Sequence, residues 1–430
     1  MFFSRGVRED WAAHARRATW SVADQTVGPA LQLLVTPLLL KWLGAPEFGL
    51  CILALALASI GPMATLGAGT ATIKHVSADL GAGRRSDAIA VVRAASWITS
   101  LGGGVLFLAS LLCGRPVARI FFHRMGDPRA VGNALAVGML VLVLQELDNV
   151  FAGALRGAQR FDVTARIELF GRFAWAGVTL SLAGIFGTAI AVLGGIACLT
   201  SLKLVVRALA TSRVLNGRCW SASLDPVQAR RLIGFGKWQW VQSVGVMLFS
   251  TIDRLLVGAW FGAPDLARYG ICLQVAQATH LLPSAAMQVT FPWMSNRIAR
   301  GQNVRGSHLV RMALIAGAFC LLLPLVLIPT SRLVLTLWLG ATFARDNVQL
   351  LRVLVIAYGL LAFNVPAYFL LLGLGRVRFV SLTTLVAGTA VVAATVVLAP
   401  LGLTAFAAAK LGYGPVILLN YNALREAVND

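Results

Sequence analysis

Charged side chains are scarce in this sequence. They make up 13% of its 430 residues, about half of the share in an average soluble protein. Hydrophobic residues reach 58% and the mean hydropathy is +0.78. The single hydrophobic core of a water-soluble protein cannot bury so much apolar surface. In addition, apolar runs of about 20 residues recur along the chain. The shortage of charge therefore excludes a large soluble helical protein and predicts an all-α polytopic membrane protein.

Acidic residues are scarcer still. There are 17 Asp and Glu against 37 Lys and Arg, which gives a formal net charge of +20. A nucleic-acid partner would be one explanation of this excess, but the cations cluster in short links between apolar runs, where orientation signals lie. We therefore expect no nucleic-acid partner, and we expect membrane lipids to surround the chain.

Patterns typical of metal sites and enzyme active sites are missing as well. Of the five histidines only His280 lies well inside an apolar run, and the cysteines lack CxxC or other metal spacing. We read the cysteines, Cys51, Cys113, Cys198, Cys219, Cys272 and Cys320, as small core residues. The sequence shows neither a glycine-rich phosphate-binding loop nor a recognisable pairing of a catalytic nucleophile with a base. We expect no metal, no cofactor and no enzyme, the alternative being a polytopic glycosyltransferase or polymerase.

The apolar runs predict twelve membrane helices. They cover residues 18–42, 47–72, 91–114, 134–154, 167–186, 188–210, 235–260, 266–292, 309–330, 349–373, 378–399 and 402–422. With the N-terminus inside, the inner links and termini hold 26 of the 37 cations, Lys203 and Arg207 among them. The outer links hold nine, including Lys410. This bias predicts that both termini are cytoplasmic. The basic segment before residue 18 does not resemble a cleavable signal peptide, so we expect the first span to remain.

The chain nearly repeats itself at a spacing of 218 residues. Trp42-Leu43-Gly44-Ala45-Pro46 matches Trp260-Phe261-Gly262-Ala263-Pro264, and Arg160-Phe161 matches Arg378-Phe379. The repeat predicts two pseudo-symmetric six-helix lobes around a central cavity, residues 1–210 and 235–430, joined by a cytoplasmic linker at 211–234. Six spans in each half make the two halves parallel repeats. We expect the two matched tryptophan motifs to form equivalent hinge-like turns.

Uncharged polar residues recur in the seventh and eighth spans. Gln239 and Gln242 lie in the seventh, and Gln274, Gln277 and Gln288 lie near one face of the eighth. Polar groups in a membrane normally face protein or a water-filled cavity. Amides that line a cavity would suit a sugar-bearing substrate, because they donate and accept hydrogen bonds without a fixed charge. The alternative is hydrogen bonding between packed helices.

Charged residues inside the spans are the second group of candidates. Asp253 and Arg254 form either a local ion pair or a functional pair, in which Arg254 meets an anionic head group and Asp253 couples to an ion. Asp24 and Asp148 are either further coupling acids or partners for inner-link arginines. In the fourth span Asp148 shares a side with Gln145 and Asn149, and we expect Glu146 to face away from them.

Several stretches resemble a known family. They are Trp42-Leu43-Gly44 with Glu47-Phe48-Gly49, then Leu66-Gly67-Ala68-Gly69, Leu155-Arg156-Gly157-Ala158-Gln159-Arg160-Phe161, and Ile252-Asp253-Arg254-Leu255-Leu256-Val257-Gly258. With twelve spans, the whole chain resembles the polysaccharide transporters, or O-antigen flippases, of the multidrug/oligosaccharidyl-lipid/polysaccharide exporter superfamily. One departure is that few cations lie inside the spans, whereas cavities of such flippases are described as strongly cationic.

The resemblance implies a function. It implies alternating-access export of an undecaprenyl-diphosphate-linked oligosaccharide across the bacterial cytoplasmic membrane, for O-antigen, capsule or exopolysaccharide synthesis. H⁺ or Na⁺ coupling and a polysaccharide polymerase partner follow from the same likeness. Murein lipid flippases and ion-coupled multidrug antiporters of the superfamily are the alternatives. We expect a monomer, because two lobes of one chain can complete the transport cycle.

Overall fold

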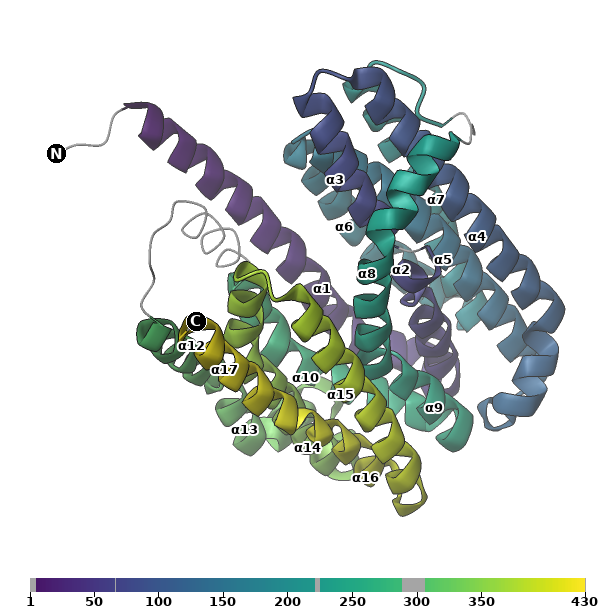
Figure 1. The fold of residues 1–430 in the computed structure, drawn as a ribbon. Helices are drawn as coiled ribbons and strands as arrows, with labels where there is room; N and C mark the ends of the chain where they lie inside the picture. The colour runs from purple at the N-terminus through teal and green to yellow at the C-terminus, as the bar shows by residue number, and fades with distance from the viewer. Residues whose placement is uncertain (1–4, 66, 221–224, 288–305, 430) are drawn as a thin grey trace. The chain divides into compact units, whose positions relative to one another are not determined.

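The computed structural model describes residues 5–65, 67–220, 225–287 and 306–429, and the statements below concern these residues (Figure 1). All regular structure within them is helical, which confirms the predicted all-α fold. Ten helical segments are long and apolar enough to cross a membrane. They make the chain a multi-pass membrane protein.

The helices of the first half are α1 (Arg5–Ala58), α2 (Gly61–Ala64), α3 (Ala68–Gly81), α4 (Arg85–Phe121), η1 (His123–Met125), α5 (Pro128–Gly157), α6 (Phe161–Phe186) and α7 (Ala189–Val214). Those of the second half are α8 (Pro226–Ser250), α9 (Ile252–Phe261), α10 (Ala263–Met287), α12 (Gly306–Cys320), α13 (Leu322–Leu339), α14 (Ala341–Gly373), α15 (Val377–Leu398), η2 (Ala399–Leu401), α16 (Leu403–Ala408), η3 (Ala409–Tyr413) and α17 (Gly414–Asn429).

Several predicted spans are interrupted by breaks that hydropathy does not register. The predicted span 47–72 is divided among the end of α1, the short α2 and the start of α3. Pro62 lies in the first turn of α2, and Gly67 adopts the left-handed conformation with φ 65° before α3. The predicted span 235–260 breaks at Thr251, between α8 and α9. The predicted span 266–292 corresponds to α10, which carries several polar residues and is not among the ten apolar segments.

The chain divides into two compact units. Unit 1 comprises Met1–Val35, Leu57–Arg119 and Pro128–Trp240, and unit 2 comprises Thr36–Ala56, Ile120–Asp127 and Val241–Asp430. The lobe boundaries at residues 210 and 235 stay a prediction.

In unit 1, α5 is the central helix and packs against α3, α6 and α7. Glycine lets α3 and α5 approach closely, because a β-carbon at Gly153 or Gly157 would collide with the backbone of α3. A buried apolar cluster joins α3, α4 and α5 and includes Val76, Val91 and Phe151. This close packing places the side chains of α5 among those of its neighbours.

In unit 2, α14 holds the central place and packs against α10, α12, α13 and α17 (Figure 1). The second part of α1 also belongs to this unit. Gly49 lies so close to the backbone carbonyl of Ala263 that no β-carbon would fit between them. The segment just after the first tryptophan motif therefore touches the second motif, because Gly49 follows Pro46 and Ala263 belongs to the second motif.

The repeated tryptophan motif has the same backbone turn in both copies. Gly44 has φ 72° and ψ 167°, and Gly262 has φ 91° and ψ −177°. Positive φ with extended ψ is a region that only glycine occupies readily. The motif is repeated because both copies need this turn, and whether the turns act as hinges stays a prediction.

A second repeated turn corrects the register of the repeat. After α5 the backbone N–H groups of Gln159 and Arg160 bond back to Arg156 and Leu155, and after α14 those of Gly375 and Arg376 bond back to Leu372 and Leu371. Both are Schellman motifs, with Gln159 and Gly375 at the left-handed position. Arg160 therefore corresponds to Arg376, at a spacing of 216 residues, and the sequence match with Arg378 is out of register by two.

Candidate functional site

Asp253 is the centre of a buried polar cluster in unit 2. It lies in the first turn of α9 and is 3% exposed. Its Oδ2 atom accepts a hydrogen bond from the Tyr269 hydroxyl at 2.6 Å and lies 3.0 Å from the Lys410 ammonium. Its Oδ1 atom accepts the backbone N–H of Arg254 at 2.8 Å. Three donors therefore surround the carboxylate, as a buried charge requires.

Lys410 is the residue that sequence reasoning misplaced. We counted it among the cations of the outer links, but it lies in η3 and is 1% exposed. Its ammonium also donates to the carbonyl of Phe249 at 2.5 Å and lies 4.3 Å from the centroid of the Phe249 ring. A lone lysine within the apolar run from Leu403 to Tyr413 was the available signal, because such a lysine needs a buried partner.

Arg254 is oriented differently from its neighbour. Its Nη2 donates to the backbone carbonyl of Ser250 at 2.7 Å, and its Nε is buried without a hydrogen-bond partner among the described residues. The partner of the Asp253 carboxylate is thus Lys410, while the Arg254 guanidinium keeps a donor available. The ion pair expected between the two consecutive residues is replaced by an ion pair with Lys410.

The predicted glutamines are divided between described and undescribed positions. Gln274 accepts from Thr36 at 2.9 Å, and Gln277 donates to the hydroxyl of Tyr358 at 3.4 Å. Gln288 lies outside the described residues, and so do the side chains of Gln239, Gln242 and Asp24. Both described glutamines make contacts between helices, as the alternative reading expected, and a role in lining a cavity stays a prediction.

Asp148 belongs to a charged cluster in unit 1. Its Oδ2 atom lies 2.9 Å from Arg207 and 3.0 Å from Lys203, both on α7. Arg207 also binds Glu168 of α6 at 2.6 Å. Sequence reasoning placed Lys203 and Arg207 in an inner link, yet Arg207 is 2% exposed inside α7. Asp148 thus partners arginine, as one alternative expected, and a coupling role for it stays a prediction.

A third buried acid lies outside the membrane-spanning segments, at the end of α3. Asp79 is fully buried and bonds Arg84 at 2.8 Å and Arg231 at 3.3 Å. Burial by itself would raise the pKa of Asp79, but hydrogen bonds and charges from both arginines hold the pKa below its ordinary value. The contact fixes the start of α8, which carries Arg231, to α3 within unit 1.

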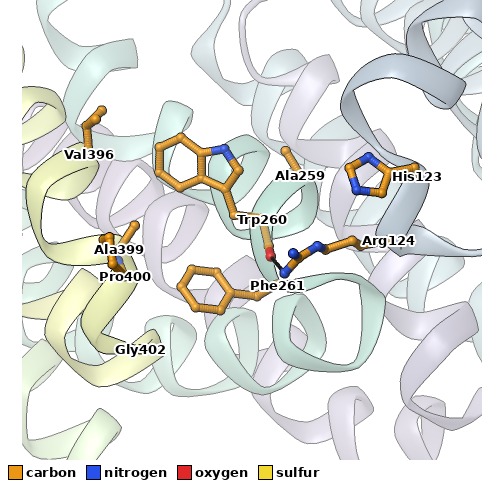
Figure 2. Close-up of a pocket in the computed structure, with 9 residues that line it drawn as sticks. All are labelled: His123, Arg124, Ala259, Trp260, Phe261, Val396, Ala399, Pro400 and Gly402. Atoms are coloured by element: carbon orange, nitrogen blue, oxygen red, sulfur yellow. Dashed lines mark hydrogen bonds between the residues drawn. The ribbon is translucent and has the colours of Figure 1, made fainter.

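One pocket lies entirely within unit 2, at the predicted outer end of α9. Its volume is about 530 Å³, within the range of sites for small molecules. Trp260 and Phe261 lie in the middle of its lining, with His123 and Arg124 on one side and Val396, Ala399, Pro400 and Gly402 on the other (Figure 2). Arg124 donates to the carbonyl of Trp260 at 2.6 Å. The repeated tryptophan was the only sequence signal for this pocket.

Metal ligands do not gather in the described part of the chain, where no group of three or more His, Cys, Asp or Glu could hold an ion. The buried acids of the membrane segments are engaged with lysine, arginine, hydroxyl and amide groups instead. These lysine, arginine, hydroxyl and amide groups can bind a ligand through their charge and their hydrogen-bond donors.

Comparison with known proteins identifies the family of the chain. Residues 38–347 match the family described as "Polysaccharide biosynthesis protein". The chain belongs to this family. A putative O-antigen transporter of Shigella flexneri is 25% identical over 153 residues, 36% of each chain. The uncharacterized membrane protein EpsK of Bacillus subtilis is 23% identical over 333 residues, or 73% of this chain and 63% of that protein. The chain thus matches between about one third and two thirds of the length of these relatives.

Solved structures show which fold this polysaccharide biosynthesis protein shares. A multidrug resistance MATE family transporter of the MOP superfamily, in an inward-facing conformation, gives a TM-score of 0.70 at 15% identity over 96% of this chain and 98% of that one. A MOP superfamily transporter from Pyrococcus furiosus, described as having a binding pocket of reverse polarity, gives a TM-score of 0.57 at 16% identity over 96% of this chain and 95% of that one. The chain therefore shares the fold of these solved structures.

Proposed function

We propose that this polysaccharide biosynthesis protein is a flippase. It moves an undecaprenyl-diphosphate-linked oligosaccharide from the inner to the outer leaflet of the cytoplasmic membrane by alternating access between its two lobes. The family match over residues 38–347, on a chain with a transporter fold, is the observation that supports this most directly. Both termini lie in the cytoplasm in this proposal, and a monomer is sufficient.

The polar chemistry of unit 2 supports an amphiphilic anionic substrate. The Nε–H of Arg254 has no hydrogen-bond partner among the described residues, and such a donor suits a phosphate oxygen. Asp253 is neutralised by Lys410, so it adds no unbalanced negative charge that would repel a diphosphate. In unit 2 a lipophilic cation would instead be favoured by an acid without a cationic partner, and Asp253 has Lys410 as its partner.

Leaflet distribution tests the proposal directly. A deletion strain without a second flippase should accumulate its lipid-linked saccharide on the cytoplasmic leaflet and lose surface glycan. Purified protein in liposomes should make the saccharide accessible to a glycosidase added outside. Normal surface glycan and normal leaflet distribution in the deletion strain would contradict the proposal. Resistance to toxic cations in an efflux-deficient host would support multidrug export instead.

A further inference from the structure

Glu146 occupies an unusual position on α5 in unit 1. Its side chain is buried, at 5% exposure, within the membrane-spanning segment Pro128–Gly157. Its Oε2 atom lies 2.7 Å from the hydroxyl of Thr65, and its Oε1 atom accepts from the amide of Asn149 at 3.1 Å. We expected Glu146 to face away from Asn149, and the structure shows that prediction to be wrong.

The partners of Glu146 differ from those of the other acids buried in the membrane segments. Asp148 binds Arg207 and Asp253 binds Lys410. Within the described part of the chain, the carboxyl group of Glu146 bonds a hydroxyl and an amide, and no cation lies within ion-pair distance of it. An ionised carboxylate without a cation is costly at membrane depth, and such a group normally becomes neutral.

Hydrogen counting at Thr65 leads to the same state. The Thr65 hydroxyl oxygen lies 2.7 Å from Glu146 Oε2 and 3.1 Å from the carbonyl oxygen of Gly61, but the hydroxyl has one hydrogen. An ionised Glu146 would leave one of these contacts without a hydrogen. A protonated Glu146 donates to Thr65, Thr65 donates to Gly61, and Asn149 donates to the other carboxyl oxygen. All contacts are then satisfied.

The carboxyl group lies at the break between α1 and α3. A side chain at Gly61 would collide with the carboxyl group of Glu146, so glycine makes room for the acid at this point. Pro62 follows in the first turn of α2, and Thr65 is the residue that ends this helix. The hydroxyl that meets Glu146 is therefore also a hydrogen-bond donor to the backbone of the broken helix.

We propose that Glu146 is a proton-binding site that holds the break at α2 and couples it to transport. In the conformation described here the proton sits on Oε2. When the proton passes to water, the carboxylate takes the Thr65 hydrogen, and the Gly61 carbonyl loses its side-chain donor. The Gly61 carbonyl then keeps only the backbone N–H of Thr65, at 3.0 Å, so the break loses one of the two hydrogen bonds on this carbonyl with each proton loss and regains it with each uptake. The coupling part of this inference rests on the proposed transport function, and the proton site does not.

Several titratable groups of the neighbouring elements have other partners. The helix α2 carries none. The acid of α3, Asp79, binds arginine, and on α7 Lys203 and Arg207 bind Asp148 and Glu168. The remaining charged side chains on these elements and on α6 are Lys74, His75, Asp162, Arg166, Arg172 and Arg213. Glu146 is the acid whose carboxyl group contacts both Thr65 and Gly61 at the break.

Infrared difference spectroscopy of the purified full chain tests the proton site without any substrate. The wild type should show a protonated carboxyl band at neutral pH that shifts in D₂O. Glu146→Gln should lose this band, because the amide reproduces the neutral shape of the acid but carries no acid proton. The matched control Glu168→Gln should retain it. A spectrum without the band, or a band that survives in Glu146→Gln, would overturn the proton site.

Liposome assays with an imposed pH gradient test the coupling. Wild-type translocation should follow the gradient, while Glu146→Gln should translocate at a rate that the gradient leaves unchanged. If Glu146→Gln responds to the gradient as the wild type does, Glu146 is not the coupling group. A wild type that moves no lipid-linked saccharide would contradict the proposed function, while the infrared result would still decide the proton site.

Discussion

The ammonium of Lys410 lies 3.0 Å from the carboxylate of Asp253, and both side chains are almost wholly buried. The pair joins η3 to α9 within unit 2 and receives a third member in the hydroxyl of Tyr269. Removing one member of a buried ion pair strands the other charge, whereas removing both charges leaves a neutral and better-tolerated site.

A double-mutant cycle should reveal this asymmetry. Lys410→Met and Asp253→Asn should each destabilise the protein by about 3–5 kcal/mol, because each leaves an uncompensated buried charge. The double variant should lose clearly less than the sum of the two. Thermal unfolding in detergent, followed by size-exclusion chromatography, provides the measurement. Strict additivity would show that the pair is not coupled.

Asp79 should make stability depend on pH in the acid range. The pKa of its carboxyl group is lowered in the folded protein from an ordinary 3.8, so the carboxylate stabilises the fold above that value. This contribution is lost as the pH falls through the lower, folded pKa. Melting temperatures measured from pH 6 downward should therefore decline less steeply in Asp79→Asn than in the wild type. Parallel curves would show that Asp79 is not responsible for the dependence.

The two copies of the tryptophan-motif turn, at Gly44 and Gly262, should differ in their tolerance of a side chain. Alanine at Gly44 or Gly262 must adopt a positive φ, which costs on the order of 1–3 kcal/mol. Gly262→Ala should be the worse of the two, because its β-carbon would also collide with the carbonyl of Arg124. At Gly44 the nearest atom is the Cδ of Pro46, at 3.8 Å.

Gly194→Ala is the matched control for both turns. Gly194 lies within α7, and no atom lies within 4 Å of an added β-carbon. Alanine there should be neutral or should stabilise the protein by up to about 1 kcal/mol. Melting temperatures of the three variants in the same detergent provide the comparison. Equal losses at all three positions would contradict the assignment of strain to the turns.

Arg254 should matter for export more than for folding. Arg254→Gln removes the charge that would meet a diphosphate, and hydrogen bonds to charged groups contribute about 1.5–3 kcal/mol. Export of lipid-linked saccharide should fall roughly tenfold or more at equal protein abundance. Arg254→Lys keeps the charge and should recover part of the activity. If export by Arg254→Gln is unchanged, the guanidinium serves only the carbonyl of Ser250.

The helical membrane fold could be predicted from the sequence because hydropathy reports which segments prefer lipid. The turns of the tryptophan motif could also be found from the sequence, because a turn that only glycine adopts readily requires glycine at both Gly44 and Gly262. The break at α2 left a weaker trace, because Pro62 and Gly67 are common inside membrane helices for other reasons.

The partners in the site could not be predicted in the same way. Lys410 was assigned to a link and Arg254 was paired with its neighbour, because sequence distance is a poor guide to contact between helices. The structure pairs Asp253 with a lysine of η3. Glu146 was set aside for facing the wrong side of its helix, although Asn149, three residues on, bonds its carboxyl group. The contacts of Glu146 depend on how its side chain is rotated and on the broken helix beside it, and neither is visible in the sequence.

The contact between Gly49 and Ala263 bears on how this protein could be divided. A fragment that ends near residue 210 would contain the segment from Thr36 to Ala56 but none of the later helices of unit 2 on which that segment packs. The complementary fragment would lack the same segment. Two half-length chains expressed apart would each be left with an unmatched helical surface. Co-expression, rather than either half alone, is the condition under which a split version would assemble.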